Sequence, residues 1–134
     1  MKAGREQVFL YNFEDAEQLR KLKSVLLCMK ARAKIVEPEW FGQPIGALAG
    51  LVEPVESEQG KDASFSEALM VLHGFSGSRI DTLLSKLRKA GVGNIPYKAV
   101  LTPTNLRWTG PELCEELKKE HEAMQQGTSA HKVD

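Results

Sequence analysis

The chain has 134 residues, of which 42% are hydrophobic and 27% are charged, a balance typical of one globular domain. Its 18 basic residues offset its 18 acidic residues, and a formal net charge of zero argues against a dedicated nucleic-acid-binding protein. No apolar run reaches the roughly 18 residues of a membrane-spanning helix, and the first residues are too polar for a secretory signal, so we expect a cytoplasmic protein without a membrane partner.

Residues 1–52 predict a first unit with the order strand, helix, strand, helix. Residues 7–11 are all compatible with a strand and four of them are strong β-formers. A helix with Asp15 as its N-cap follows, because apolar residues recur at helical spacing at Leu19, Leu22, Leu26 and Met29. Residues 33–36 predict a second strand that ends before Pro38, and residues 45–52 predict a short helix.

Residues 53–66 are rich in acidic residues, Pro and Gly, and we expect a flexible acidic linker there. A second unit of the same order follows at 67–124. Its predicted elements are a strand at 68–72, a helix capped by Ser78 and stopped by Gly91, a strand at 97–101, and a helix from about 111 to 124 whose capping box is Thr109 and Glu112. We expect residues 125–134 to form a disordered tail.

The two units therefore suggest an internal duplication, in which two β-α-β-α units share one four-stranded sheet. The first strand of each unit is the more apolar, whereas the second strands carry Lys34 and Lys98, and lysine is common on edge strands. We expect an α+β, ferredoxin-like sandwich with the helices on one face of an antiparallel sheet. The alternative is an α/β three-layer parallel sheet, which the unbroken apolar run at 68–72 favours.

The richest polar segment, residues 102–111, joins a predicted strand to a predicted helix. Such junctions often bind ligands, and the free N–H groups and dipole of a helix N-terminus favour an anion. Turn and capping chemistry explains many of the same residue types. The candidate ligand-binding residues are Thr102, Thr104, Asn105, Arg107 and Trp108.

A hydrolase or transferase that uses Ser76 or His73 is an alternative function. The segment from His73 to Ser78 resembles the oxyanion loop of α/β-hydrolases and nearly matches a nucleophile elbow, but position 78 is Ser rather than Gly. The chain is also too short for that fold. We therefore expect no catalytic residue. The scattered histidines and cysteines predict neither a metal site nor a cofactor, and Cys28 and Cys114 are most simply helix-packing residues.

Charge is distributed unevenly along the chain. Residues 18–34 contain six basic residues and no acidic one, whereas residues 112–122 contain five glutamates and two lysines. Solvated helix faces explain such runs, and the opposite signs also suit self-association, for example as a dimer. Nucleic-acid binding through the basic segment 15–34 is a further alternative.

The second half of the chain resembles the bacterial family called domain of unknown function 3783. The resemblance covers residues 68–124 and rests on "GFS", "IPYKAVLTPTNLRWT" and "ELCEELKKEHEAM". It implies a bacterial, cytoplasmic protein and no assigned activity. From the residues we expect a non-enzymatic binding or regulatory module with a small anionic ligand or a peptide at 102–111.

Overall fold

The two most apolar strands lie side by side at the centre of one four-stranded sheet in the computed structural model, which describes residues 6–55 and 65–133. The strand order is β2-β1-β3-β4, so the lysine-bearing strands are the edges, as predicted. The central pair is antiparallel, and each edge strand runs parallel to the central strand of its own half. The strands are β1 (Gln7–Tyr11), β2 (Arg32–Ile35), β3 (Leu69–His73) and β4 (Tyr97–Val100).

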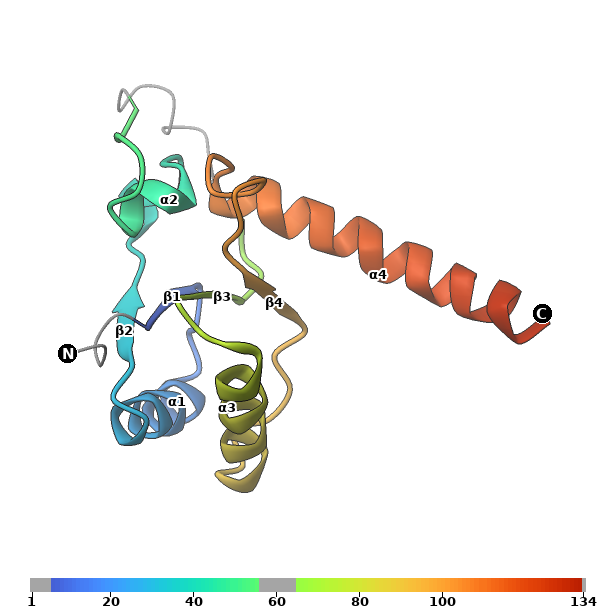
Figure 1. Cartoon of the computed structure of the whole chain (residues 1–134), viewed down its shortest axis with the longest axis horizontal. Helices are drawn as coiled ribbons and strands as arrows, with labels where there is room; N and C mark the ends of the chain where they lie inside the picture. The colour runs from blue at the N-terminus through green and yellow to red at the C-terminus, as the bar shows by residue number, and fades with distance from the viewer. Residues whose placement is uncertain (1–5, 56–64, 134) are drawn as a thin grey trace.

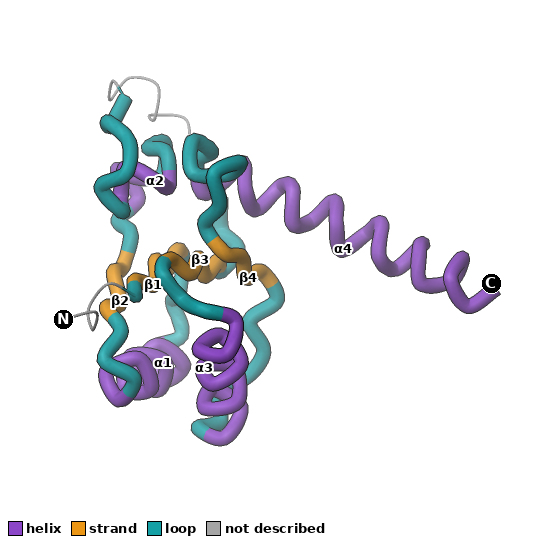
Figure 2. The backbone as a smooth tube through the Cα atoms, in the orientation of Figure 1, coloured by secondary structure: helices purple, strands orange, loops and turns teal. Residues whose placement is uncertain are grey.

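Helices cover both faces of this sheet (Figures 1 and 2). Two helices of 13 residues, α1 and α3, pack on one face, and α2 and the start of α4 lie on the other. The helical elements are α1 (Ala16–Cys28), the 3-10 turn η1 (Pro38–Trp40), α2 (Ile45–Leu48), α3 (Gly77–Lys89) and α4 (Gly110–Val133).

The central strands are apolar over residues 8–11 and 69–72 because each contributes to two cores. In β1, Val8 and Leu10 point into the core beneath α1 and α3, whereas Phe9 and Tyr11 point into the core beneath α2 and α4. Successive strand residues alternate between faces, so a strand covered on both sides loses its polar positions. All four of these side chains are fully buried.

The structure is thus α+β with one mixed sheet, and the ferredoxin-like sandwich is not confirmed. Helices on one face only and an antiparallel sheet were both wrong expectations. The alternative was right about three layers but wrong about an all-parallel sheet. The reason lies in the crossovers. A helix between two adjacent strands makes them parallel, and only the contact between the halves is antiparallel.

Local capping explains where the two long helices of the first layer begin. The Asp15 carboxylate accepts hydrogen bonds from the backbone N–H groups of Glu17 and Gln18, so the predicted N-cap of α1 is confirmed. Helix α3 is capped by Ser76 and not by Ser78, because the Ser76 hydroxyl accepts the N–H of Arg79 at 3.2 Å. The Gln18 amide donates to the carbonyl of Val92, which ties the two halves together.

The end of α4, the position of Cys28 and the linker differ from the expectations or lie outside the described residues. Helix α4 continues through Val133, where we expected a tail from residue 125. Cys28 is exposed rather than packed, whereas Cys114 is buried. The linker expected at 53–66 lies largely outside the described residues, since 56–64 are not described.

Candidate functional site

The junction between β4 and α4 is a closed turn held by the side chain of Asn105. Its side-chain oxygen accepts the backbone N–H of Thr102 at 2.9 Å, and its amide nitrogen donates to the carbonyl of Val100 at 3.1 Å. In return, the hydroxyl of Thr102 accepts the N–H of Asn105. Asn105 is only 8% exposed. Thr102 and Asn105, two of the predicted ligand-binding residues, therefore form hydrogen bonds within the turn. The Asn105 amide is already bonded to the main chain.

The same junction is fixed from the other half of the chain. The backbone N–H groups of Ile45 and Gly46 donate to the carbonyls of Trp108 and Leu106, at 2.8 and 2.7 Å. A Cβ atom on Gly46 would lie 2.8 Å from the Leu106 carbonyl oxygen, so only glycine allows this approach. The backbone around Trp108 is consequently held by two segments that are far apart in sequence.

The remaining predicted residues do not converge on one point. Thr104 is exposed. Arg107 is also exposed and lines a shallow cleft of about 370 Å³ with residues 50–53. Trp108 is half-buried and lines a separate cleft. The five candidates thus divide into a structural turn and two different surfaces.

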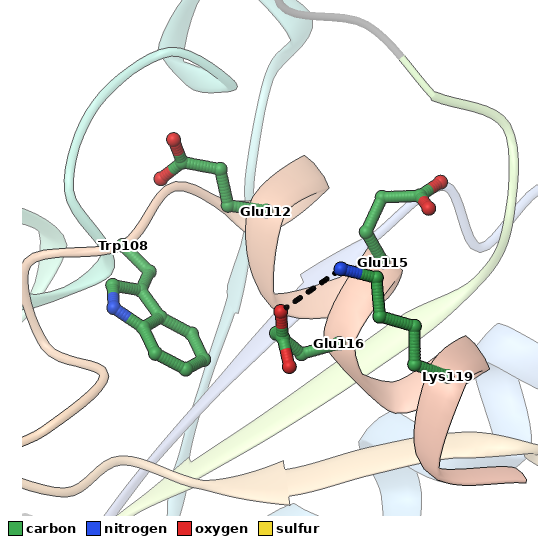
Figure 3. Close-up of a pocket in the computed structure, with 5 residues that line it drawn as sticks. All are labelled: Trp108, Glu112, Glu115, Glu116 and Lys119. Carbon is green, nitrogen blue, oxygen red and sulfur yellow. Dashed lines mark hydrogen bonds and ion pairs between the residues drawn. The ribbon is translucent and has the colours of Figure 1, made fainter. Parts of the chain in front are cut away.

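The cleft beside Trp108 has a volume of about 440 Å³ and combines an aromatic wall with charged side chains from α4 (Figure 3). The indole packs partly against the core beneath α4. In Figure 3 the carboxylate of Glu116 lies between that indole and the ammonium of Lys119. The residues that line the cleft are Trp108, Glu112, Glu115, Glu116 and Lys119.

The first turn of α4 is rigid because the predicted capping box forms. The N–H of Thr109 donates to the carboxylate of Glu112 at 2.9 Å, and the N–H of Glu112 donates to the hydroxyl of Thr109 at 3.2 Å. This arrangement satisfies two helix-terminal donors and fixes the direction in which the helix starts. The position of the cleft residues relative to Trp108 follows from it.

The lining of the cleft is acidic, whereas we expected the helix N-terminus to attract an anionic ligand. Three glutamates and one lysine line it, and Lys119 already pairs with Glu116 at 3.5 Å. The nearby Lys118 pairs with Glu67, which raises the pKa of Lys118 and lowers that of Glu67, and it also pairs with Glu115 of the cleft at 3.4 Å. A full carboxylate charge outweighs the partial charge of a helix end. The lining of the Trp108 cleft therefore has more acidic than basic side chains.

Ser76 and His73, the alternative catalytic residues, lie at the start of α3 and at the end of β3. The Ser76 hydroxyl accepts the α3 capping bond and lies 3.3 Å from the hydroxyl of Ser78. His73 is the last residue of β3, and among the described side chains it makes no hydrogen bond to Ser76. A nucleophile needs a base within hydrogen-bond reach, so this pair is not arranged as a catalytic dyad.

The basic segment lies on α1 and β2, away from the Trp108 cleft. Arg20 pairs with Glu17 at 2.6 Å, and Lys21 donates to the carbonyl of Gly91 at 3.4 Å. The other basic side chains of this segment are exposed and form no ion pair within the described residues; they are Lys23, Lys30, Arg32 and Lys34.

Sequence reasoning identified Trp108 but missed most of its surroundings. Glu112, Glu116 and Lys119 follow one another at helical spacing of four and three residues, so they share one face of α4. That spacing was visible in the sequence. The angle at which the helix leaves the sheet was not, and it decides whether this face meets the tryptophan.

Comparison with known proteins finds one match. The family model "Domain of unknown function (DUF3783)" matches residues 68–124. No curated protein and no solved structure matches the chain. Within the described ranges, no three His, Cys, Asp or Glu side chains are grouped so that they could hold a metal ion, and no helix is both long and apolar enough to cross a membrane. The part of the chain that resembles this family, residues 68–124, includes every residue named in the lining of the Trp108 cleft.

Proposed function

We propose that the protein is a non-enzymatic binding module that recognises a cationic side chain of a peptide in the Trp108 cleft. The observation that carries this proposal is the half-exposed indole in a cleft lined by three glutamates and one lysine, with the carboxylate of Glu116 toward the indole. A guanidinium or ammonium group over an indole gains from the ring quadrupole, and a carboxylate adds an ion pair. An arginine side chain suits this site best because its planar group both stacks and forms paired hydrogen bonds.

A rigid frame supports this proposal. Trp108 is held through its own carbonyl by Ile45, and the Thr109–Glu112 box fixes the helix that carries the carboxylates. A site that is ordered before binding loses less conformational entropy when the ligand arrives. A peptide also fits better than a small anion, because the surrounding carboxylates repel an anion.

We also propose that the two halves, 1–52 and 67–124, arose by duplication and that only the second acquired the cleft. The repeated order of strand, helix, strand and helix supports this view, as does the parallel pairing within each half. The corresponding segment of the first half contributes backbone donors from Ile45 and Gly46 that hold the site in place.

Tryptophan fluorescence tests the binding proposal directly. The chain has two tryptophans, so the variant Trp40→Phe leaves Trp108 as the only reporter. Titration with a hexa-arginine peptide is expected to change its emission, with weaker binding at higher salt. A hexa-glutamate peptide of the same length should cause no change. Equal responses to both peptides would contradict the proposal.

Two variants then locate the contact. Glu116→Gln removes one carboxylate beside the indole and should weaken binding about fivefold, a size typical of a partly exposed ion pair. Glu14→Gln removes an equal charge from an exposed position before α1 and should leave binding unchanged. If both variants weaken binding equally, the attraction is general charge and not the cleft.

A further inference from the structure

Helix α4 leaves the body of the protein after its first turns. Its buried residues, Leu113 and Cys114, lie near its start, and every residue from Lys119 to Met124 is exposed. The helix nevertheless continues to Val133, and Figures 1 and 2 show it projecting beyond β4. Most helical stability in proteins comes from packing against a neighbour. Between Lys119 and Met124, His121 packs its ring against Tyr97 of β4, and the other side chains of this outer part of α4 are exposed to solvent among the described residues.

The two most exposed large apolar side chains of the described residues are Leu27, at 79%, and Met124, at 67%. Leu27 shares the outer face of α1 with Arg20 and Lys23, at helical spacing of seven and four residues. Met124 follows the exposed Glu120 on α4 by four residues. Leu27 thus has two basic residues on its helix face, and Met124 has one acidic residue on its own.

A single chain does not bring these surfaces together. The inner face of α1 packs on the core that contains Val8 and Leu10, whereas α4 packs through Leu113 on the opposite side of the sheet. Figure 1 shows α1 and the outer part of α4 well separated, with the sheet between their layers. Within one copy, neither surface covers the other.

We propose that this partner is a second copy of the same chain, with the outer part of α4 from one copy lying across the exposed face of α1 in the other. The two surfaces are complementary in both charge and apolar content: Leu27 meets Met124, and Lys23 faces Glu120. A twofold axis makes the contact twice and closes the assembly as a dimer. A nucleic acid also suits the basic face, but it leaves Leu27 and the acidic helix uncovered.

This inference uses the outer part of α4 and not the Trp108 cleft, so it is independent of the proposed function. The native cysteines allow a direct test, because Cys28 lies beside Leu27 and is exposed, whereas Cys114 is buried. In the variant Met124→Cys, mild oxidation is expected to link Cys28 of one copy to position 124 of the other. Peptide mass spectrometry of the covalent dimer identifies the pair. The control adds Cys28→Ser, which should abolish that dimer.

A dimer linked only through position 124 in both copies, or through Cys28 in both, would overturn the proposed pairing. Absence of any covalent dimer would overturn it as well. If the double variant with Cys28→Ser still forms the same amount of dimer, the contact does not involve α1.

Charge reversal tests the same contact without a covalent link. Sedimentation equilibrium should show a dimer that Leu27→Asp weakens about tenfold or more, since it removes a buried apolar contact twice. Lys23→Glu and Glu120→Lys should each weaken it about fivefold, and the double variant should restore it. A wild-type monomer at all concentrations, or a monomer that is retained instead by duplex DNA or RNA, would overturn the proposal. Failure of the double variant to recover would overturn the assigned charge pair.

Discussion

The two segments that follow the edge strands have the same place in each half, but they differ in helix length and in burial. After β2, the chain passes through η1 into α2, a helix of four residues with no side-chain cap, whose Ile45 and Leu48 are buried. After β4, the Asn105 turn leads into α4, a helix of 24 residues that starts with a capping box. The first segment fills the core and holds the second in place. The second presents Trp108 and acidic side chains to the solvent.

Segments in the same position of the two halves thus differ in burial and in helix length. The backbone donors of the first segment bond to the carbonyls of the second, so one half rigidifies the other. Substitutions in these segments and in the contacts around them are expected to change the free energy of unfolding by different amounts.

The largest effect is expected where α4 meets β1. A Cβ atom at Gly110 would collide with the ring of Tyr11, which is itself fully buried and held between the aromatic rings of Phe41 and Phe65. Gly110→Ala should therefore lower the free energy of unfolding by about 3 kcal/mol, as overpacking of a core does. Urea denaturation measures this.

The matched control is Gly77→Ala at the start of α3. A Cβ atom there meets nothing within 4 Å, so the variant should be neutral or slightly stabilising. If Gly110→Ala were as harmless as Gly77→Ala, the close approach of α4 to Tyr11 would be wrong.

Asn105→Ala is expected to have the second largest effect. It leaves the N–H of Thr102 and the carbonyl of Val100 without their partner, and both groups lie in a partly buried turn. The loss should be about 2 kcal/mol in the free energy of unfolding. Thr104→Ala, on an exposed neighbour, should change stability by less than about 0.5 kcal/mol. Equal effects of the two would mean that the turn does not depend on the amide.

The elements themselves could be predicted from the sequence. The bounds of β1 match the prediction residue for residue, and Lys34 and Lys98 correctly placed β2 and β4 at the edges. These features are local, since they depend on side-chain period and on how lysine protects an edge. The caps at Asp15 and Thr109 were also predicted because capping involves residues two or three apart.

The arrangement of elements could not be predicted in the same way. A β-α-β unit does not reveal whether another strand is inserted between its two strands, and this choice decides between an antiparallel and a mixed sheet. The Trp108 cleft was missed for a similar reason. Its acidic wall comes from Glu115 and Glu116, and their relation to the indole depends on tertiary packing.

Tyr11→Phe should strengthen the contact between the halves. The Tyr11 hydroxyl is buried and has no hydrogen-bond partner among the described residues. Removing it should raise the free energy of unfolding by about 1 kcal/mol, because an unpaired buried polar group is costly. Thermal denaturation at neutral pH measures the gain, and a lower melting temperature would indicate a partner for the hydroxyl.

The same residue predicts an alkaline effect. Burial raises the pKa of Tyr11 above its ordinary value of 10. The unfolded chain therefore loses this proton first as the pH rises above about 10, and the stability of the wild type should fall there. Tyr11→Phe should lose less stability over the same range. If the free energies of unfolding of the two proteins fell equally as the pH rose, Tyr11 would not be the cause of the alkaline loss of stability.

The smallest expected effect concerns the layer opposite the cleft, where Arg79 of α3 donates to both oxygens of Glu6 and to the carbonyl of Met29. The Arg79 guanidinium lowers the pKa of the Glu6 carboxyl below its usual value of 4.5. The ion pair therefore stabilises the fold above pH 4.5, and its contribution is lost as the pH falls through the lowered value.

Glu6→Gln should cost only about 0.5 kcal/mol at neutral pH, because Arg79 is partly exposed to solvent. The difference between the two proteins, measured by urea denaturation, should disappear in acid, because protonated glutamic acid and glutamine are both neutral. A difference that persists at low pH would show that Glu6 acts through packing and not through charge.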